Sequence, residues 1–236
     1  MTLAATPLAS SRVVASWDET PSLRAVRLQL AGEQARAHER PGQVVKLHTR
    51  VGEAYFAIAS APSATGVIDL LVKRGGRVAD AAIAAAVAGA SIDMSPPFGK
   101  GFPVEEGEGQ DVLLFAAGSG IAPIRAIVQH VLGHRALFGR VTLFYGQRHG
   151  ADFAYTGEHV AWEGSGVQVV LCPSGEDEAW PGVRGRVQEV ARSLAFGGAH
   201  PERTVAFVCG MTAMVDDVRA TLAGAGIPPE RVHLNF

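Results

Sequence analysis

The chain has 236 residues, of which 47% are hydrophobic, and its formal net charge is −2. This composition supports a sizeable buried core, and the length favours two domains over one large α/β domain. The mixed charge provides no basic face for nucleic acid, and no apolar run approaches the roughly 20 residues of a membrane-spanning helix.

The first residues, MTLAATPLASSRVV, lack the long apolar stretch of a secretory signal, so we expect a cytoplasmic protein. The two cysteines, Cys172 and Cys209, are far apart in the sequence. We therefore expect neither a four-cysteine iron–sulfur cluster held by this chain nor a structural zinc site.

Short strand-like runs dominate the first hundred residues: RVVASWDET, LRAVRLQL, VVKLHT, YFAIAS and VIDLLVKR. Runs of this kind, separated by Gly- and Pro-containing turns, are typical of a small antiparallel barrel or sandwich. The alanine-rich stretch between Arg77 and Ala90 predicts a helix, and the prolines and glycines of 92–102 predict a loop. The polar run EEGEGQ at 105–110 predicts a linker, which divides the chain into domains of residues 1–106 and 107–236.

The second half follows a different pattern. The runs DVLLFAA, VTLFYGQ, VQVVLC and TVAFVCG are almost continuously apolar, and segments with helical spacing separate them. This pattern predicts a parallel sheet covered by helices on both faces, with a ligand site at the carboxyl ends of the strands.

The stretch from Asp111 to Pro123 reads as strand, glycine turn and helix. Gly118 and Gly120 have no Cβ and can adopt positive φ, so a diphosphate can approach the backbone N–H groups at the positive end of the helix. Pro123 suits the first helical turn. Glycine turns are also ordinary loop chemistry, so the triplet alone leaves both interpretations open.

Eight separated segments match one family in the correct order: PGQVVKLHT, AIASAP, PPFGKGF, AAGSGIAP, LFYGQR, RGRV, FVCGMTAM and RVHLNF. Together they resemble the ferredoxin-NADP reductase superfamily, in a small form without a fused iron–sulfur domain. The resemblance covers nearly the whole chain. It implies an antiparallel β-barrel that binds FAD, followed by a parallel-sheet, Rossmann-like domain that binds NAD(P).

The resemblance assigns flavin contacts to three segments of the first domain: Phe56, Ala57, Ile58, Ala59 and Ser60; Gly75, Gly76 and Arg77; and Phe98, Gly99 and Lys100. Ala54, Phe56 and Ala57 occupy the places of the family's Arg, Tyr and Ser, so those side-chain contacts are missing. Backbone groups of Ala57, Ile58 and Ser60 remain to bind the flavin edge. Each segment also has an alternative interpretation without flavin. The first is then only barrel core, the second an ordinary turn beside a solvated arginine, and the third a plain loop.

In the second domain, the resemblance gives the nucleotide diphosphate to Gly118, Ser119, Gly120 and Pro123. It places Cys209, Gly210 and Met211 against the nicotinamide. Cys209 and the terminal Phe236, which would stack on the flavin, are the predicted catalytic residues. A buried cysteine at a strand end and a phenylalanine that caps the core are the alternatives.

The segment after the third strand of this domain, Ser174-Gly175-Glu176-Asp177-Glu178, carries a hydroxyl and three carboxylates. Carboxylates repel a 2′-phosphate and accept hydrogen bonds from a ribose diol, so NADH is favoured over NADPH. Arg148, Arg184 and Arg186 could overturn this preference if one of them folds into the site; the favoured alternative is that they are solvated surface arginines.

The predicted function is a flavin-dependent oxidoreductase that passes electrons from NAD(P)H through FAD to a separate acceptor. That acceptor is a ferredoxin, a haem or oxygenase partner, or a small molecule. The alternatives are a regulatory nucleotide-binding module with a degraded flavin site, and a subunit that works only inside a larger complex. The sequence gives no indication of oligomeric state.

Overall fold

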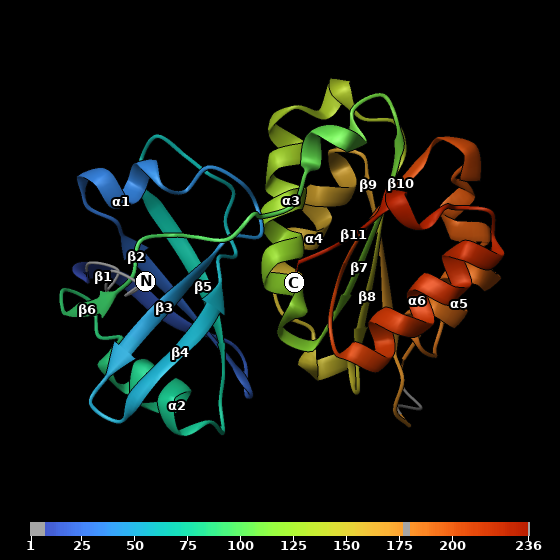
Figure 1. The fold of residues 1–236 in the computed structure, drawn as a ribbon. Coiled ribbons are helices and arrows are strands. Elements are labelled where there is room, and N and C mark those ends of the chain that lie inside the picture. Colours follow the sequence, from blue (N-terminus) through green and yellow to red (C-terminus); the bar gives the residue numbers. More distant parts are fainter. Residues whose placement is uncertain (1–7, 177–179, 236) are drawn as a thin grey trace, which may run out of the picture.

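The computed structural model describes residues 8–176 and 180–235, which form two sheets side by side (Figure 1). The first sheet is antiparallel, with the strand order β4-β3-β6-β1-β2-β5. Its strands are β1 (Ala9–Thr20), β2 (Leu23–Gln29), β3 (Val44–Thr49), β4 (Gly52–Ala57), β5 (Val67–Lys73) and β6 (Ser91–Met94). A bridge between Ile58, just beyond β4, and Leu70 of β5 joins the two edges. The sheet therefore closes into the predicted barrel.

Two short helices accompany the barrel, α1 (Gly32–Arg36) and α2 (Arg77–Ala85). Helix α2 ends five residues before the predicted Ala90, because Ala86 leaves the helical conformation with φ −78° and ψ 59°. Strand β6 lies in the stretch that was predicted to be a loop. Its four residues pair with β1 and β3, which are distant in the sequence, so the prediction for this stretch was wrong at its start.

The second sheet is parallel throughout, with the order β11-β10-β7-β8-β9. Its strands are β7 (Asp111–Ala117), β8 (Val141–Gln147), β9 (Val167–Pro173), β10 (Thr204–Cys209) and β11 (Val232–Leu234). The helices of this half are α3 (Ile121–Gly133), α4 (Thr156–Gly164), α5 (Val187–Ser193) and α6 (Thr212–Gly224). The predicted parallel sheet with intervening helices is confirmed.

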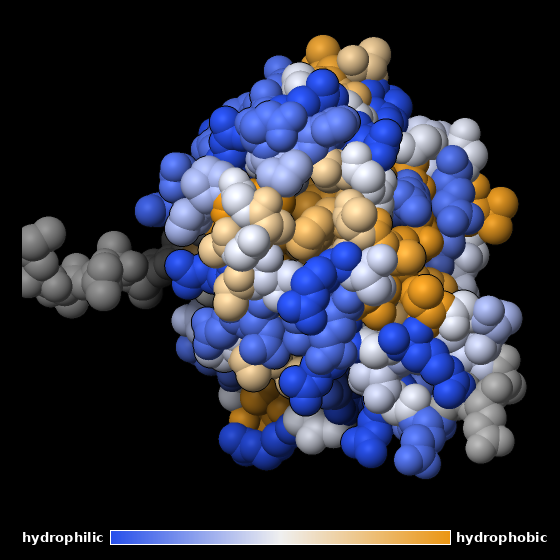
Figure 2. Space-filling view, turned by 90° about the vertical axis from the view of Figure 1, so that its right-hand side faces the viewer, coloured by the Kyte–Doolittle hydropathy of each residue, from blue (hydrophilic) through white to orange (hydrophobic). Residues whose placement is uncertain are grey.

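Helices cover both faces of the parallel sheet, as its continuous apolar strands require. Leu113 and Phe115 of β7 belong to a core shared with α5 and α6, whereas Val112 and Leu114 belong to a core shared with α3 and α4. Figure 1 shows α3 and α4 between the sheet and the barrel. The face that carries α5 and α6 is mostly hydrophilic, with smaller apolar areas (Figure 2).

The core on the α3 side continues into the barrel. Leu23, Ala59, Leu71 and Phe102 pack into the same apolar cluster as helix α3 and the parallel strands. The two sheets therefore share a buried interface. A 3₁₀ turn at Val104–Gly107 occupies part of the predicted linker between them.

No helix in residues 8–176 and 180–235 is long and apolar enough to cross a membrane. The same residues contain no group of three or more His, Cys, Asp or Glu side chains arranged to hold a metal ion.

The barrel contains a histidine that must stay neutral. His38 is 7% exposed, and its Nε2 is buried without a hydrogen-bond partner. Burial lowers its pKa from 6.5 to about 4. Because the unfolded chain binds this proton more readily, stability should be complete above pH 6.5 and fall as the pH drops towards 4.

We expect this one group to cost about 2 kcal/mol of unfolding free energy at pH 5 relative to pH 7. Urea unfolding at the two pH values measures the loss. The His38→Gln variant should lose correspondingly less stability over the same interval. Equal losses in the variant and the native chain would contradict the expectation.

Candidate functional site

A cleft lies where the carboxyl ends of the parallel strands face the barrel. Its volume is about 1110 Å³, and both sheets contribute to its walls. The predicted site residues on these walls are Phe56, Ala57, Gly118, Ser119, Gly120, Pro123, Cys209, Gly210 and Met211. Segments that are far apart in the sequence therefore meet at one place, at the strand edge where the sequence predicted a ligand.

The glycine turn after β7 forms the floor of the cleft. Gly118 has φ +58°, a conformation that favours glycine, and no atom within 4 Å would obstruct a Cβ there. Gly118–Gly120 form one 3₁₀ turn, and α3 begins at Ile121, two residues before the predicted start at Pro123. The N–H of Ile121 already donates to the carbonyl oxygens of Gly118 and Ser119, so the helical stretch effectively begins at the turn. An anion here would meet the first N–H groups of Gly118–Gly120 and the positive end of the α3 dipole.

Gly120 is required for a different reason. A Cβ at this position would collide with the carbonyl oxygen of Cys209 and lie 2.8 Å from its carbonyl carbon. The turn after β7 therefore packs directly on the end of β10. This contact holds Gly118–Gly120, the predicted cradle for the diphosphate, beside the predicted nicotinamide segment at Cys209.

Tyr145 of β8 supports the turn from below. Its hydroxyl lies 3.5 Å from the carbonyl oxygen of Gly118, accepts a hydrogen bond from Gln147 and lies 3.3 Å from the backbone nitrogen of Ala154. Burial raises the pKa of Tyr145 to about 12, so the hydroxyl is neutral and can donate to the carbonyl. Sequence reasoning missed this residue, because a tyrosine in an apolar strand reads as core.

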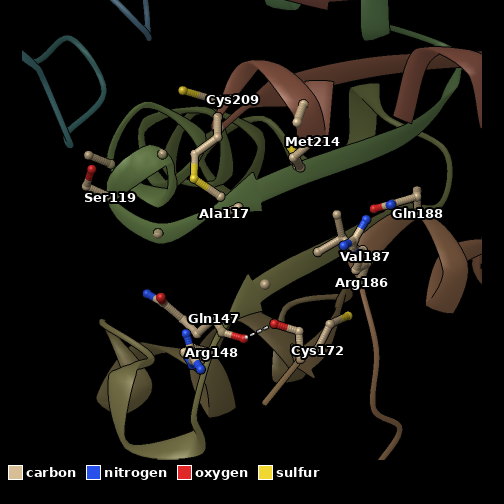
Figure 3. Close-up of a pocket in the computed structure, with 18 of the residues that line it drawn as sticks. Ala117, Ser119, Gln147, Arg148, Cys172, Arg186, Val187, Gln188, Cys209 and Met214 are labelled. Carbon is tan, nitrogen blue, oxygen red and sulfur yellow. Dashed lines mark hydrogen bonds between the residues drawn. The ribbon is translucent and has the colours of Figure 1, made fainter. Parts of the chain in front are cut away.

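Cys209 is the last residue of β10 and is 7% exposed. Burial raises the pKa of its thiol to about 12, so the side chain is a neutral thiol at physiological pH. A Cβ at the next residue, Gly210, would lie 2.7 Å from Sδ of Met214, so the Met214 side chain would have to move. Figure 3 shows the side chains of Ser119 and Cys209 beside the pocket. Phe236, the other predicted catalytic residue, lies outside the described residues.

On the barrel side, Phe56 and Ala57 line the cleft, whereas Ile58, Ala59 and Ser60 are buried behind it. The N–H of Ile58 donates to the carbonyl of Gln43 at 2.9 Å. Ser60 Oγ accepts a hydrogen bond from the N–H of Asp69 at 3.0 Å. These two groups are therefore used within the barrel, which leaves Phe56 and Ala57 as the members of this segment on the cleft wall.

Two further predicted segments lie outside the main cleft. Gly75, Gly76 and Arg77 stand at the start of α2, where Asp80 accepts a hydrogen bond from the Gly75 N–H at 2.9 Å. Arg77 lies beside β4, with Nη2 3.9 Å from the place of a Cβ at Gly52. Phe98, Gly99 and Lys100 are exposed, and the Phe98 ring contacts the ring of Tyr55 edge to face at 5.9 Å.

The cleft also has wall residues that the sequence did not assign. Leu71 and Lys73 come from β5; Glu189 and Asp217 come from α5 and α6. Arg148 and Arg186, two of the three arginines that bear on the nucleotide preference, also lie on the wall, whereas the third, Arg184, is exposed and lies outside it. Figure 3 shows Gln147 and Arg148 on one part of the wall and Arg186 and Gln188 on another. The rule that ligands bind at carboxyl strand ends would have located Gln147 and Arg148, which end and follow β8.

The comparisons with known proteins agree with this geometry. A family model described as the oxidoreductase NAD-binding domain matches residues 114–220, which include the glycine turn and Cys209. The gamma subunit of sulfhydrogenase 1 from Pyrococcus furiosus is 31% identical over 202 residues, which cover 84% of this chain and 68% of that subunit. The chain belongs to the ferredoxin-NADP reductase superfamily.

Other members of the ferredoxin-NADP reductase superfamily are similar over most of the chain. The ferredoxin–NAD(+) reductase component of the alkene monooxygenase system of Xanthobacter autotrophicus is 26% identical and covers 83% of this chain and 60% of its own. The fold also matches a ferredoxin NADP+ reductase from Neisseria gonorrhoeae, solved with bound FAD and NADP, at a TM-score of 0.79 and 19% identity. That match covers 99% of this chain and 100% of the other.

Proposed function

We propose that this chain is an FAD-dependent NAD(P)H reductase that passes electrons to a separate acceptor. The observation that carries the proposal is the cleft between the barrel and the parallel sheet. Phe56 and Ala57, which the resemblance assigns to flavin, lie on one wall, and the glycine turn and Cys209, which it assigns to the nucleotide, lie on the other. We propose residues 1–106 as the flavin domain and residues 107–236 as the nucleotide domain.

The nucleotide wall fits a diphosphate. The space beside Gly118 is open, Gly120 has no room for a side chain, and the first N–H groups of the turn lie at the positive end of α3. We propose that Gly118, Ser119, Gly120 and Pro123 hold the diphosphate, and that Cys209, Gly210 and Met211 lie along the nicotinamide. The neutral Cys209 thiol supplies a small polarisable surface rather than a charge or a base.

The barrel wall fits an isoalloxazine ring with fewer polar contacts than is usual in the family. Phe56 offers an aromatic face, Ala57 leaves space, and Lys73 at the end of β5 is a cation on the same wall. Arg77 at the start of α2 is the candidate partner for the FAD diphosphate, although the carboxylate of Asp80 already lies at that helix end and accepts the Gly75 N–H. The predicted contacts of Gly75, Gly76, Phe98, Gly99 and Lys100 remain part of this proposal.

If FAD is bound here, it would supply the redox chemistry, namely acceptance of a hydride from NAD(P)H and onward transfer of two electrons to the acceptor. The chain itself binds and orients the two cofactors and excludes water between them. No side chain on the cleft wall has to act as an acid or a base.

We propose a redox protein as the acceptor, with a small molecule as the alternative, and the cytoplasm as the location. The names of the relatives support a redox protein as the acceptor. One is a sulfhydrogenase subunit, and others are reductase components of propane and alkene monooxygenases. Each of these names describes a component of a multi-protein system.

Flavin binding is the direct test. The purified chain is incubated with FAD, excess flavin is removed, and bound flavin is measured by its visible absorption. We expect close to one FAD per chain. A chain that retains neither FAD nor FMN would contradict the proposal and support the regulatory nucleotide-binding module.

We propose NADH as the favoured nucleotide. Carboxylates of Glu189 and Asp217 line the cleft, Asp217 lies 3.7 Å from Arg186, and Glu176 follows the wall residues Ser174 and Gly175. Asp177 and Glu178, which also entered the prediction, lie outside the described residues. Arg148 and Arg186 are the opposing features, because both are exposed cations on the same wall, and Asp217 offsets only the charge of Arg186.

We expect kcat/KM to be about 10-fold or more higher with NADH than with NADPH, since nearby carboxylates repel a 2′-phosphate. Steady-state kinetics with a dye acceptor measures the ratio. The Arg148→Ala variant should change the NADH value little. A ratio that favours NADPH in the native chain, and that collapses in Arg148→Ala, would reverse the assignment.

A further inference from the structure

Helix α3 contacts the barrel at two points on the segment that follows β4. Nη1 of Arg125 donates a hydrogen bond to the carbonyl oxygen of Ala59 at 2.8 Å. Oε1 of Gln129 accepts one from the N–H of Ala61 at 3.0 Å. Ala59 lies two residues beyond Ala57 of the cleft wall.

The same helix begins directly after the glycine turn. Arg125 is four residues from Ile121, or about 6 Å along the helix axis. Helix α3 therefore has the proposed diphosphate cradle at its amino end and is hydrogen-bonded, one turn later, to the segment behind the proposed flavin wall. The relative position of the two walls depends on these hydrogen bonds.

The Arg125 side chain is buried and has partners on several elements. It is 5% exposed, and it donates to both carboxylate oxygens of Glu158 on α4 at 2.6–3.1 Å. It lies 3.3 Å from Asp69 on β5, and its guanidinium lies 4.5 Å from the centre of the Tyr155 ring. A planar guanidinium satisfies acceptors on several elements at fixed angles, which the single ammonium of lysine does not.

A second link between the barrel and the nucleotide half runs through the backbone of Tyr155. Oε2 of Glu19, in β1, accepts a hydrogen bond from the N–H of Tyr155 at 2.8 Å, while Oε1 accepts one from Nε1 of Trp17 at 2.6 Å. Tyr155 is thus fixed to the barrel through its backbone and to Arg125 through its ring.

We propose that Arg125 is a positioning residue for hydride transfer, and that it sets the separation between the cradle and the flavin wall. The inference rests on the proposed function. Reacting atoms must lie about 3–3.5 Å apart, and a displacement of about 1 Å can lower a rate about 100-fold. Arg125 touches neither cofactor in this proposal and acts through the backbone of Ala59.

The test is the Arg125→Met variant, which keeps the length of the side chain and removes the guanidinium. Asp69 keeps its two hydrogen bonds from Arg27, at 2.7 and 2.9 Å, and the carboxylate of Glu158 is 35% exposed and can be hydrated. The variant therefore leaves no fully buried charge without a partner. We expect it to fold and to bind FAD as the native chain does.

Two measurements decide the role. At saturating nucleotide, the stopped-flow rate of flavin reduction should fall about 10- to 100-fold, with KM changed less than about 3-fold. In the flavin-free chain, hydrogen exchange at the Ala61 N–H should be about 10-fold faster.

The matched control is Arg27→Met. It removes the other arginine of the same Asp69, but both partners lie within the barrel. We expect lower stability and an unchanged reduction rate. Should Arg125→Met fail to fold, Gln129→Leu replaces it, and its reduction rate should fall about 3-fold or more.

Equal reduction rates in Arg125→Met and Arg27→Met would overturn the inference, as would unchanged exchange at Ala61 or a native rate in Gln129→Leu. Failure of the proposed function has a different signature. In that case the native chain itself would not be reduced by either nucleotide.

Discussion

Replacing Gly120 with alanine should lower the rate of flavin reduction by NAD(P)H about 100-fold or more. The backbone of Gly120 has φ −61°, which alanine adopts without strain, so the entire effect comes from the added methyl group. That methyl would lie 2.8 Å from the carbonyl carbon of Cys209 and 3.1 Å from the nitrogen of Gly210. These neighbours are backbone atoms at the end of a buried strand, so either the cradle or the nicotinamide segment must move.

The same overpacking should cost about 1–3 kcal/mol of unfolding free energy. Single-turnover reduction and thermal unfolding measure the two effects. Gly224→Ala is the control, since this glycine ends α6 with no atom within 4 Å of an added Cβ. It should keep the native rate and stability, or gain a little stability. A Gly120→Ala chain that is reduced at the native rate would contradict the role of the turn.

Replacing Asp111 with asparagine should destabilise the fold by about 3 kcal/mol without changing the nucleotide site. Asp111 opens β7 at the amino edge of the parallel sheet, opposite the cleft, and is 2% exposed. Its Oδ1 accepts hydrogen bonds from the N–H of Arg140 at 3.0 Å and from Arg203 at 3.1 Å; its Oδ2 accepts one from the N–H of His200 at 3.1 Å. An asparagine turns one acceptor into a donor that faces these donors.

Burial alone would raise the pKa of Asp111, but the donors from Arg140, His200 and Arg203 outweigh it and hold the pKa below 3.8. The stabilisation is therefore present above pH 3.8 and is lost as the pH falls through the lower, folded value. Urea unfolding at pH 7 and near pH 3 should show the difference between native chain and variant shrinking at the acid end. Arg203→Ala, at an arginine side chain that is 51% exposed, should cost less than about 1 kcal/mol. A pH-independent difference would contradict this account.

The parallel sheet could be predicted from the sequence because each of its strands has a recognisable local pattern. Strands buried on both faces are continuously apolar, and their carboxyl ends coincide with the glycine turn and with Cys209-Gly210. Ligands of parallel sheets bind at the carboxyl ends of the strands, and this rule located the site without knowledge of any side-chain contact. The predicted start of α3 at Pro123 was two residues late, since the helix begins at Ile121 and proline is tolerated throughout the first turn.

The features that were missed depend on partners far away in the chain. The four residues of β6 carry too little pattern to predict a strand, and they are one only because β1 and β3 flank them. Arg125 looks like an ordinary polar residue of an amphipathic helix. Its burial arises where α3 meets Ala59 and Asp69, a contact between segments more than 50 residues apart. The engagement of the Ile58 N–H by Gln43 likewise follows from barrel closure.

The most direct test of the central claim is an anaerobic titration of the FAD-loaded chain with NADH and, separately, with NADPH, followed by the visible absorption of the flavin. The proposed cleft predicts that one equivalent of NADH bleaches the oxidised flavin, and that readmitting an acceptor restores it. A chain that holds FAD and keeps its full absorption with both nucleotides would contradict the claim that the two walls bring flavin and nicotinamide together.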